Sequence, residues 1–180
     1  IGADQLALSF NKSFGLPVTI LRPFNRYGPR QSLRAVIPTI AEQILNGKTK
    51  IDLGAITPTR DFTHVSDTAM GFMQVLQSDA VIGKVANIGS NFEISIGDTV
   101  AMIADILDKK VEIVSDSERV RPISSEVERL FSDTQLAQDN FNWSPKYGGI
   151  EGFRTGLVDT LDWFSNPKNL ATYKTNIYNI

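Results

Sequence analysis

The segment that follows Val18 constrains the fold most, because a short strand there runs directly into a loop. Val18–Leu21 has the apolar, β-branched composition of a buried strand. Pro23 cannot donate a hydrogen bond to a sheet, so the strand is predicted to end near Arg22. Gly28–Pro29 then predicts a turn. The chain must therefore leave a sheet and enter a loop that no continuous helix can span.

Arginines recur at every fourth position through this Pro- and Gly-broken segment: Arg22, Arg26, Arg30 and Arg34. In open α/β sheets, ligands bind beyond the carboxyl ends of the strands. Guanidinium groups offer planar pairs of donors that suit phosphate. We therefore expect this loop to bind an anionic small molecule.

Helical and strand patterns alternate along the rest of the chain, which predicts the α/β class. The predicted helices are 1–14, 35–45, 66–76, one that begins after Ser95 and reaches Leu107, 132–141 and 150–164. The predicted strands are 18–22, 50–53, 60–65, 84–89 and 111–114. In helix 66–76 the apolar spacing predicts an inward face made of Ala69, Phe72, Met73 and Leu76. We expect one domain over residues 1–165, followed by a polar tail at 166–180.

Composition excludes several classes of function. The net charge of −2 argues against a nucleic-acid surface built on bulk basicity. The absence of cysteine excludes disulfides and cysteine-based zinc sites or nucleophiles, and a lone His64 makes a metal site improbable. No apolar run approaches the roughly 18 residues of a membrane span, and no signal-peptide pattern opens the chain. A cytoplasmic protein without membrane contact is expected.

Two further groups of charged residues are ambiguous. Arg60–Asp61 is either a phosphate contact held by a carboxylate or an ordinary surface ion pair, and spacing alone favours the ion pair. Asn25 either donates to a phosphate or sugar oxygen or shapes a turn. A third group either forms a solvated face or closes on a ligand: Arg119, Arg121, Glu126 and Arg129.

The sequence lacks the motifs of a complete catalyst. It contains no G-x-G-x-x-G, no P-loop and no G-x-S-x-G, and no tyrosine is followed by a lysine four residues on. We therefore predict no catalytic residue in this chain. The apolar spacing of the first helix begins at the first residues without a start signal, which favours a fragment over a processed start.

Taken in order, several strings resemble one family: Leu21–Arg30, Ile37–Pro38, Arg60–Asp67, Asn87–Gly89, Arg121–Pro122 and Trp143–Pro145 followed by an amphipathic helix. This set resembles the extended short-chain dehydrogenase/reductases, the NAD-dependent nucleotide-sugar epimerases and dehydratases. Ser125–Val127 with Arg129 looks most similar to the bacterial 4,6-dehydratases that act on UDP-N-acetylglucosamine-type sugars. The resemblance covers essentially residues 1–165.

The resemblance implies that the chain is the C-terminal part of a Rossmann-type sheet with a small substrate-binding lobe. The family's Gly-rich NAD loop and Tyr-x-x-x-Lys pair are not in this sequence. In the full enzyme, NAD would take a hydride from C4 of the sugar, water would leave across C5–C6, and the hydride would return to C6. The alternatives are a part of a nucleotide-sugar 4-epimerase, a non-catalytic binding or assembly module, and a fragment with no independent role.

The resemblance also implies a binding site for UDP- or another nucleotide-sugar, and for NAD. Arg60 and Arg121 would hold the diphosphate, Asn25 would donate to it, and Arg22 at the strand's end belongs to the same expected site. The base pocket would be shaped by Val36, Ile37, Pro38, Ile51 and Leu53. Pro23 and Phe24 would lie near the nicotinamide. Helix 1–14 would pack in a dimer interface.

Overall fold

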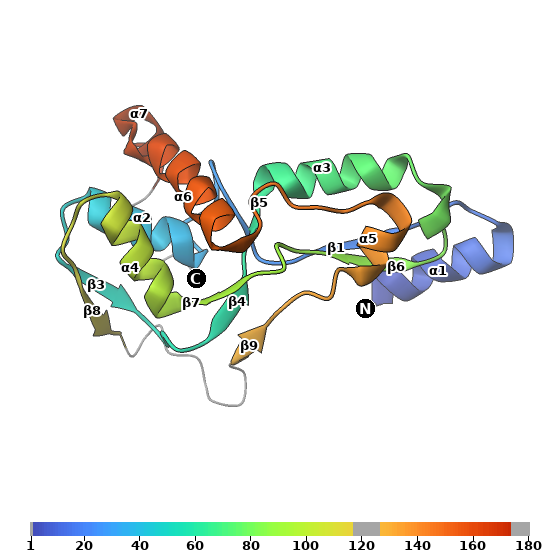
Figure 1. The fold of residues 1–180 in the computed structure, drawn as a ribbon, viewed down its shortest axis with the longest axis horizontal. Helices are drawn as coiled ribbons and strands as arrows, with labels where there is room; N and C mark the ends of the chain where they lie inside the picture. Colours follow the sequence, from blue (N-terminus) through green and yellow to red (C-terminus); the bar gives the residue numbers. More distant parts are fainter. Residues whose placement is uncertain (1, 117–126, 174–180) are drawn as a thin grey trace.

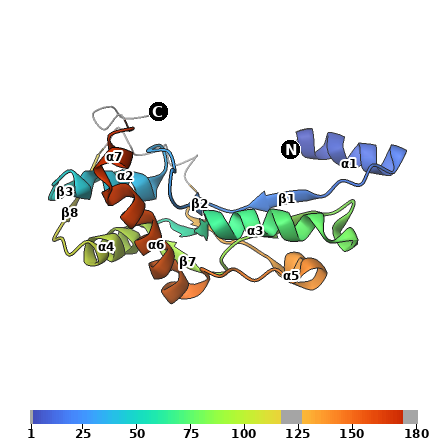
Figure 2. The same ribbon diagram turned by 90° about the horizontal axis from the view of Figure 1, so that it is seen from above.

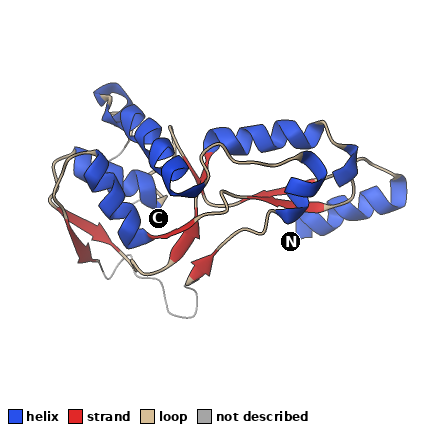
Figure 3. Cartoon of the chain, in the orientation of Figure 1, coloured by secondary structure: helices blue, strands red, loops and turns tan. Residues whose placement is uncertain are grey.

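The computed structural model describes residues 2–116 and 127–173 (Figure 1). Helices and strands alternate along the chain (Figure 3), so the predicted α/β class is confirmed. The elements are α1 (Gly2–Phe14), β1 (Ile20–Pro23), β2 (Arg26–Tyr27), α2 (Val36–Leu45), β3 (Lys50–Leu53), β4 (Thr59–Asp61), β5 (Thr63–His64), α3 (Val65–Leu76), the 3-10 helix η1 (Asp79–Val81), β6 (Val85–Ile88), β7 (Glu93–Ser95), α4 (Ile96–Ile106), β8 (Glu112–Ser115), β9 (Arg129–Leu130), α5 (Gln135–Phe141), α6 (Gly149–Ser165) and α7 (Pro167–Leu170).

The described strands form small sheets in which parallel pairing dominates. β1 pairs with β6, β2 with β5, and β3 with β8, all in parallel. β4 lies between antiparallel β7 and parallel β9. Parallel strands need long connections between them, which is why a helix or loop excursion separates each pair in the sequence.

Two hydrophobic cores define two lobes, which lie at opposite ends of the molecule (Figure 1). The lobe with the smaller hydrophobic core, called the small lobe from here on, contains α1, β1, α3, β6 and α5. Its core includes Ala86, Ile88, Phe141 and Trp143. The large lobe contains α2, β3, α4, β8 and α6, and its core is built from these helices with the rings of Tyr27, Phe62 and Phe153. β4 lies between the lobes.

Several predicted helix boundaries are confirmed. α1 ends at Phe14, and Gly15 follows with a φ of +67°, the left-handed conformation that glycine adopts most readily after a helix. Gly47, with a φ of +83°, ends α2 in a similar way. Ser95 caps α4, because its Oγ accepts a hydrogen bond of 2.9 Å from the backbone N–H of Asp98.

The strand predicted over 60–65 is wrong, because two short strands occupy this segment and belong to different sheets. β4 ends at Asp61 and pairs with β7 and β9, whereas β5 begins at Thr63 and pairs with β2. His64 is already the N-cap of α3, and its Nδ1 accepts from the backbone N–H of Ser66. Alternation in sequence did not reveal this change of partner at Phe62.

The predicted inward face of α3 is also wrong. Its buried residues are Asp67, Thr68 and Gly71. The predicted apolar face is exposed: Ala69, Phe72, Met73 and Leu76. The helix approaches β6 closely through Gly71, where a side chain would meet Ile88 and Trp143. Helical periodicity identifies an apolar face, but it does not identify which face the rest of the chain covers.

Three local predictions also need correction. β1 continues through Pro23, beyond the predicted end at Arg22, because the next backbone N–H, that of Phe24, donates to Ile88. The helix predicted over 132–141 begins only at Gln135, and the Ser132 hydroxyl donates to Asp61. Within the predicted polar tail, Pro167–Leu170 forms α7. Among the helices of the described ranges, none combines the length and apolarity needed to cross a bilayer.

Candidate functional site

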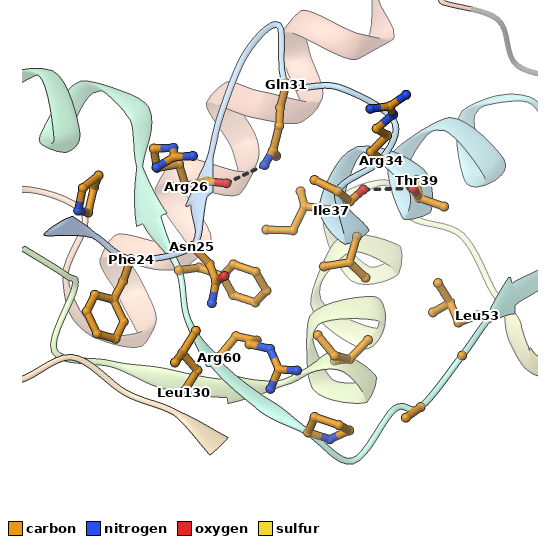
Figure 4. A pocket seen from close by; sticks show the side chains of 18 residues that line it. Phe24, Asn25, Arg26, Gln31, Arg34, Ile37, Thr39, Leu53, Arg60 and Leu130 are labelled. Atoms are coloured by element: carbon orange, nitrogen blue, oxygen red, sulfur yellow. Dashed lines mark hydrogen bonds between the residues drawn. The ribbon is translucent and has the colours of Figure 1, made fainter. Parts of the chain in front are cut away.

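A cavity of about 670 Å³ opens between the loop after β1, the start of α2 and the β3–β4 connection (Figure 4). This volume lies in the ordinary range for small-molecule sites. The cavity is lined by Pro23, Phe24, Asn25, Arg26, Gln31, Arg34, Ala35, Val36, Ile37, Thr39, Leu53, Gly54, Ala55, Pro58, Arg60, Phe62, Ile96 and Leu130.

Asn25 and Arg60 supply hydrogen-bond donors to this cavity. The amide Nδ2 of Asn25 is buried without a hydrogen-bond partner. A buried donor left unpaired costs about 1–3 kcal/mol, so it favours a ligand that carries an acceptor. Arg60 is half-buried, and its Nη1 donates to the Thr59 carbonyl at 2.8 Å. In Figure 4 both side chains lie on the same side of the cavity.

The N-terminus of α2 adds further donors. The helix begins at Val36, and its N-cap, Ala35, has no side chain that could accept from the first backbone N–H groups. Ala35, Val36 and Ile37 all line the cavity. The first N–H groups of a helix lack partners within the helix and favour anions through the helix dipole. Together with Arg60 and Asn25, this end of α2 makes the cavity suitable for a phosphate group.

The remaining wall is largely apolar. Leu53 and Pro58 come from the β3–β4 segment, Phe62 follows β4, and Ile96 begins α4. Such a surface suits the flat face of a ring rather than a charged group. The cavity therefore combines an anion-binding end with an apolar wall.

The structure brings most of the predicted site residues together. The predicted residues that line this one cavity are Pro23, Phe24, Asn25, Val36, Ile37, Leu53 and Arg60. Pro38 and Ile51 are buried in the large lobe and do not line the cavity. Arg121 lies outside the described residues, as do Arg119 and Glu126.

Arg22 does not belong to the lining. Its Nη2 lies 2.5 Å from the Asp4 carboxylate of α1. This hydrogen bond lowers the pKa of Asp4 below its usual value. In β1, Arg22 is the exposed residue, and it points toward α1 rather than toward the loop. The four-residue spacing of the arginines did not show that the first of them has a partner elsewhere.

Among the lining residues that were not predicted site residues, three carry long polar side chains: Arg26, Gln31 and Arg34. Arg26 and Arg34 stood out only as members of the arginine series, and nothing in the sequence distinguished Gln31. The Nε2 of Gln31 donates to the Arg26 carbonyl at 2.5 Å, and its Oε1 is buried without a partner. The carbonyl can only accept, so the amide orientation is fixed and Oε1 remains available to a donor.

An aromatic cluster that includes Tyr27 packs against the loop that follows β1. Tyr27 packs edge-on against His64 and Phe153, with ring centroids 5.2 Å apart in both pairs. Burial raises the pKa of Tyr27 well above its usual value, so the phenol stays neutral. Burial also lowers the pKa of His64, although Asp159 lies 3.3 Å from its Nε2. These residues fix the loop by packing and do not line the cavity.

Comparisons with known proteins agree with this architecture. The crystal structure of dTDP-glucose 4,6-dehydratase from Bacillus anthracis in complex with NAD superimposes with a TM-score of 0.79 at 32% identity, covering 96% of this chain and 51% of that one. UDP-glucuronic acid 4-epimerase from Bacillus cereus, in complex with UDP-glucuronic acid and NAD, gives a TM-score of 0.77 at 28% identity, covering 89% and 49%. A dTDP-glucose 4,6-dehydratase from Mycolicibacterium smegmatis is 30% identical over 162 residues, which are 90% of this chain and 47% of that protein.

The fold places the chain in the extended short-chain dehydrogenase/reductase class, to which these NAD-dependent sugar-nucleotide dehydratases and epimerases belong. More specifically, the chain belongs to the family whose model is described as GDP-mannose 4,6 dehydratase, which matches residues 1–155. The chain spans about half the length of the relatives named above.

Proposed function

We propose that this chain is the nucleotide-sugar-binding portion of an NAD-dependent 4,6-dehydratase, and that the cavity beside α2 holds the nucleoside diphosphate. The observation that carries the proposal is one cavity that combines Arg60, the unpartnered Nδ2 of Asn25 and the uncapped start of α2. A diphosphate is the part of a nucleotide-sugar that needs several donors at once. The apolar wall at Leu53 would then contact the base.

The cofactor site is proposed only in part. Pro23 and Phe24 end β1 and line the cavity with apolar, half-buried surface, which suits a nicotinamide ring. When bound, NAD accepts a hydride from the sugar and returns it. The sequence contains neither a G-x-G-x-x-G nor a Tyr-x-x-x-Lys, so we propose that the 180-residue chain binds nucleotide-sugar without turnover.

A 4-epimerase is the second candidate, because the epimerase from Bacillus cereus shares the fold.

Arg60→Ala tests the binding proposal. Loss of charge-assisted hydrogen bonds costs about 1.5–3 kcal/mol each, so the affinity for UDP-glucose or dTDP-glucose should fall roughly 10- to 100-fold. Isothermal titration calorimetry measures the change. Binding by the wild type that is unaltered in Arg60→Ala would refute the diphosphate assignment.

Two arginine variants serve as matched controls. Arg154→Ala removes the same charge from α6, where Arg154 pairs with Asp105 at 2.7 Å outside the cavity lining. Arg22→Ala removes the arginine that pairs with Asp4. Both variants should bind within about twofold of the wild type, since solvent-exposed ion pairs contribute little. A loss at Arg22 as large as that at Arg60 would place the anion site elsewhere.

We also propose that two copies associate through α1. None of its residues is buried, and its exposed apolar side chains include Leu6, Phe10 and Phe14. The rings of Phe10 and Phe14 lie 5.3 Å apart and form one continuous patch. An apolar patch of this kind favours association.

A further inference from the structure

We infer that Asp61 is a positioning residue that holds Arg60 in the cavity. This inference deepens the proposed function and depends on it for its binding readout. Asp61 is fully buried, whereas its neighbour Arg60 lines the cavity. The two are adjacent in β4, so any constraint on one backbone position is passed directly to the other.

Strand geometry explains why the two side chains have different surroundings. Successive side chains of a strand point to opposite faces. Arg60 and Phe62 both line the cavity, whereas Asp61 between them does not, and its carboxylate is held by Ser90 and Ser132. The contacts that hold Asp61 on one face of β4 therefore also fix the position of Arg60 on the cavity face.

Four hydrogen bonds hold Asp61. Its Oδ1 accepts from the backbone N–H and the hydroxyl of Ser90, both at 2.7 Å. Its Oδ2 accepts from the backbone N–H of Ser132 at 3.3 Å and from the Ser132 hydroxyl. Ser90 lies between β6 and β7, and Ser132 follows β9, so one carboxylate joins β4 to two segments far apart in sequence.

The space beside the Asp61 carboxylate leaves no room for a side chain at Gly89. An ideal Cβ at Gly89 would lie 2.7 Å from Asp61 Oδ2 and would collide with the Ser132 side chain. The Gly89 carbonyl also accepts from Trp143 Nε1 at 3.1 Å. The carboxylate thus anchors β4 to the core of the small lobe.

Backbone pairing alone fixes β4 weakly. The strand has three residues, with three register pairs to β7 and two to β9. Such short pairings define register poorly without side-chain anchors. Asp61 supplies one such anchor, in addition to the 2.8 Å hydrogen bond that the Thr59 hydroxyl donates to Glu93 of β7. A shift of β4 by one residue would move Arg60 out of the cavity.

The test is a double-mutant cycle with Arg60→Ala and Asp61→Asn, using calorimetric titration with UDP. An Asn places its NH₂ against the backbone N–H of either Ser90 or Ser132, so no orientation satisfies both sides. Asp61→Asn should weaken UDP binding about as much as Arg60→Ala does. The double variant should bind no more weakly than Arg60→Ala alone. If Asp61→Asn weakens binding equally in both backgrounds, Asp61 acts on the fold in general and the inference is wrong.

Asp67→Asn is the matched control. Asp67 is also buried and accepts backbone N–H groups, from Lys146 at 3.1 Å and Tyr147 at 2.9 Å, but unlike Asp61 it has no neighbour in the chain that lines the cavity. This variant should lose stability to urea and retain UDP affinity. If it loses UDP affinity like Asp61→Asn does, the effect is one of stability and the inference fails.

Two further measurements cover failure of the main variant. If Asp61→Asn does not fold, Ser132→Ala replaces it, because this variant removes one donor to Asp61. It should weaken UDP binding only while Arg60 is present, and equal weakening in the Arg60→Ala background refutes the inference.

If the wild type does not bind UDP, the proposed function fails, and NMR relaxation of the Arg60 Nε–H still tests positioning. That group should be ordered in the wild type and mobile in Ser132→Ala, and unchanged order would overturn the inference.

Discussion

His64 shows how a single residue can have a role that its sequence context does not reveal. Its Nδ1 accepts from the Ser66 backbone N–H, so the proton of the neutral ring lies on Nε2, which faces Asp159 at 3.3 Å. The ring also packs against Tyr147 in a tilted arrangement, with centroids 4.3 Å apart and an angle of 45° between the ring planes. In the sequence, His64 lies inside the strand predicted over 60–65, so the pattern gave no indication that it caps a helix.

We predict that His64 makes stability depend on pH. Burial lowers the pKa of the folded-state imidazole below the usual 6.5, so the unfolded chain binds a proton at a pH where the folded chain does not. The free energy of unfolding should therefore fall as pH drops below about 6.5, until the folded-state pKa is reached. Above that range this group contributes no pH dependence.

Urea unfolding at pH 7.5 and pH 5.5 measures this effect. His64→Asn is the comparison, because asparagine is a good N-cap and does not titrate. The wild type should lose more stability between the two pH values than His64→Asn does. Equal losses in the two proteins would show that His64 does not titrate differently on folding.

At the scale of elements, the sequence predicted where helices lie better than which side of each is buried. α1, α2 and β3 have nearly their predicted bounds, because apolar spacing and glycine stops are local signals. The orientation of α3 is set by tertiary packing of Gly71 against Trp143, which is 72 positions further along the chain. The partners of Asp61 escaped prediction for the same reason, since Ser90 and Ser132 are joined to it only by the fold.

Gly71→Ala tests the packing of α3. An ideal Cβ there would lie 2.7 Å from Ile88 Cδ1 and 2.9 Å from Trp143 Cζ3. Overpacking of this kind costs about 1–3 kcal/mol, which should exceed the roughly 1 kcal/mol that alanine gains over glycine in a helix. We expect a net loss of stability to urea and a change in tryptophan fluorescence.

Gly97→Ala is the matched control in α4. Its ideal Cβ would lie 3.5 Å from the nearest atom, the Ile56 carbonyl oxygen, which is an ordinary contact. This variant should be neutral or more stable by up to about 1 kcal/mol. If Gly71→Ala behaves in the same way, α3 does not depend on a close approach at Gly71.

At the scale of the whole molecule, the candidate site lies where distant parts of the chain meet. The loop after β1, the start of α2 and β4 contribute the polar side chains and backbone groups, and β4 is anchored to the small lobe through Asp61. From spacing alone, Asn25 and Arg60 were separate ambiguous features, and only the family resemblance assigned them to one diphosphate site. Their common location could not be deduced from spacing, because it depends on how the two lobes pack around β4.

The small lobe also presents two apolar surfaces, on α1 and on α3, and in the view of Figure 2 these helices lie on opposite sides of β1. Leu6 is 61% exposed on α1, and Met73 is 55% exposed on α3. Each belongs to a continuous apolar face of its helix, and such a face favours association more than scattered apolar surface residues do. The proposed self-association must therefore be assigned to one face by comparison with the other.

We predict that α1 is the associating face. Sedimentation equilibrium of the wild type should show a concentration-dependent dimer. Replacing Leu6 and Phe10 together with serine should shift the protein to the monomer, because it removes two of the three large exposed apolar side chains of α1. Replacing Phe72 and Met73 with serine removes a similar area from α3 and should leave the dimer intact. If the α3 variant becomes monomeric and the α1 variant does not, two copies associate through α3. A monomeric wild type at all concentrations would exclude both faces, and the apolar surface of α1 would then have no role in pairing two copies.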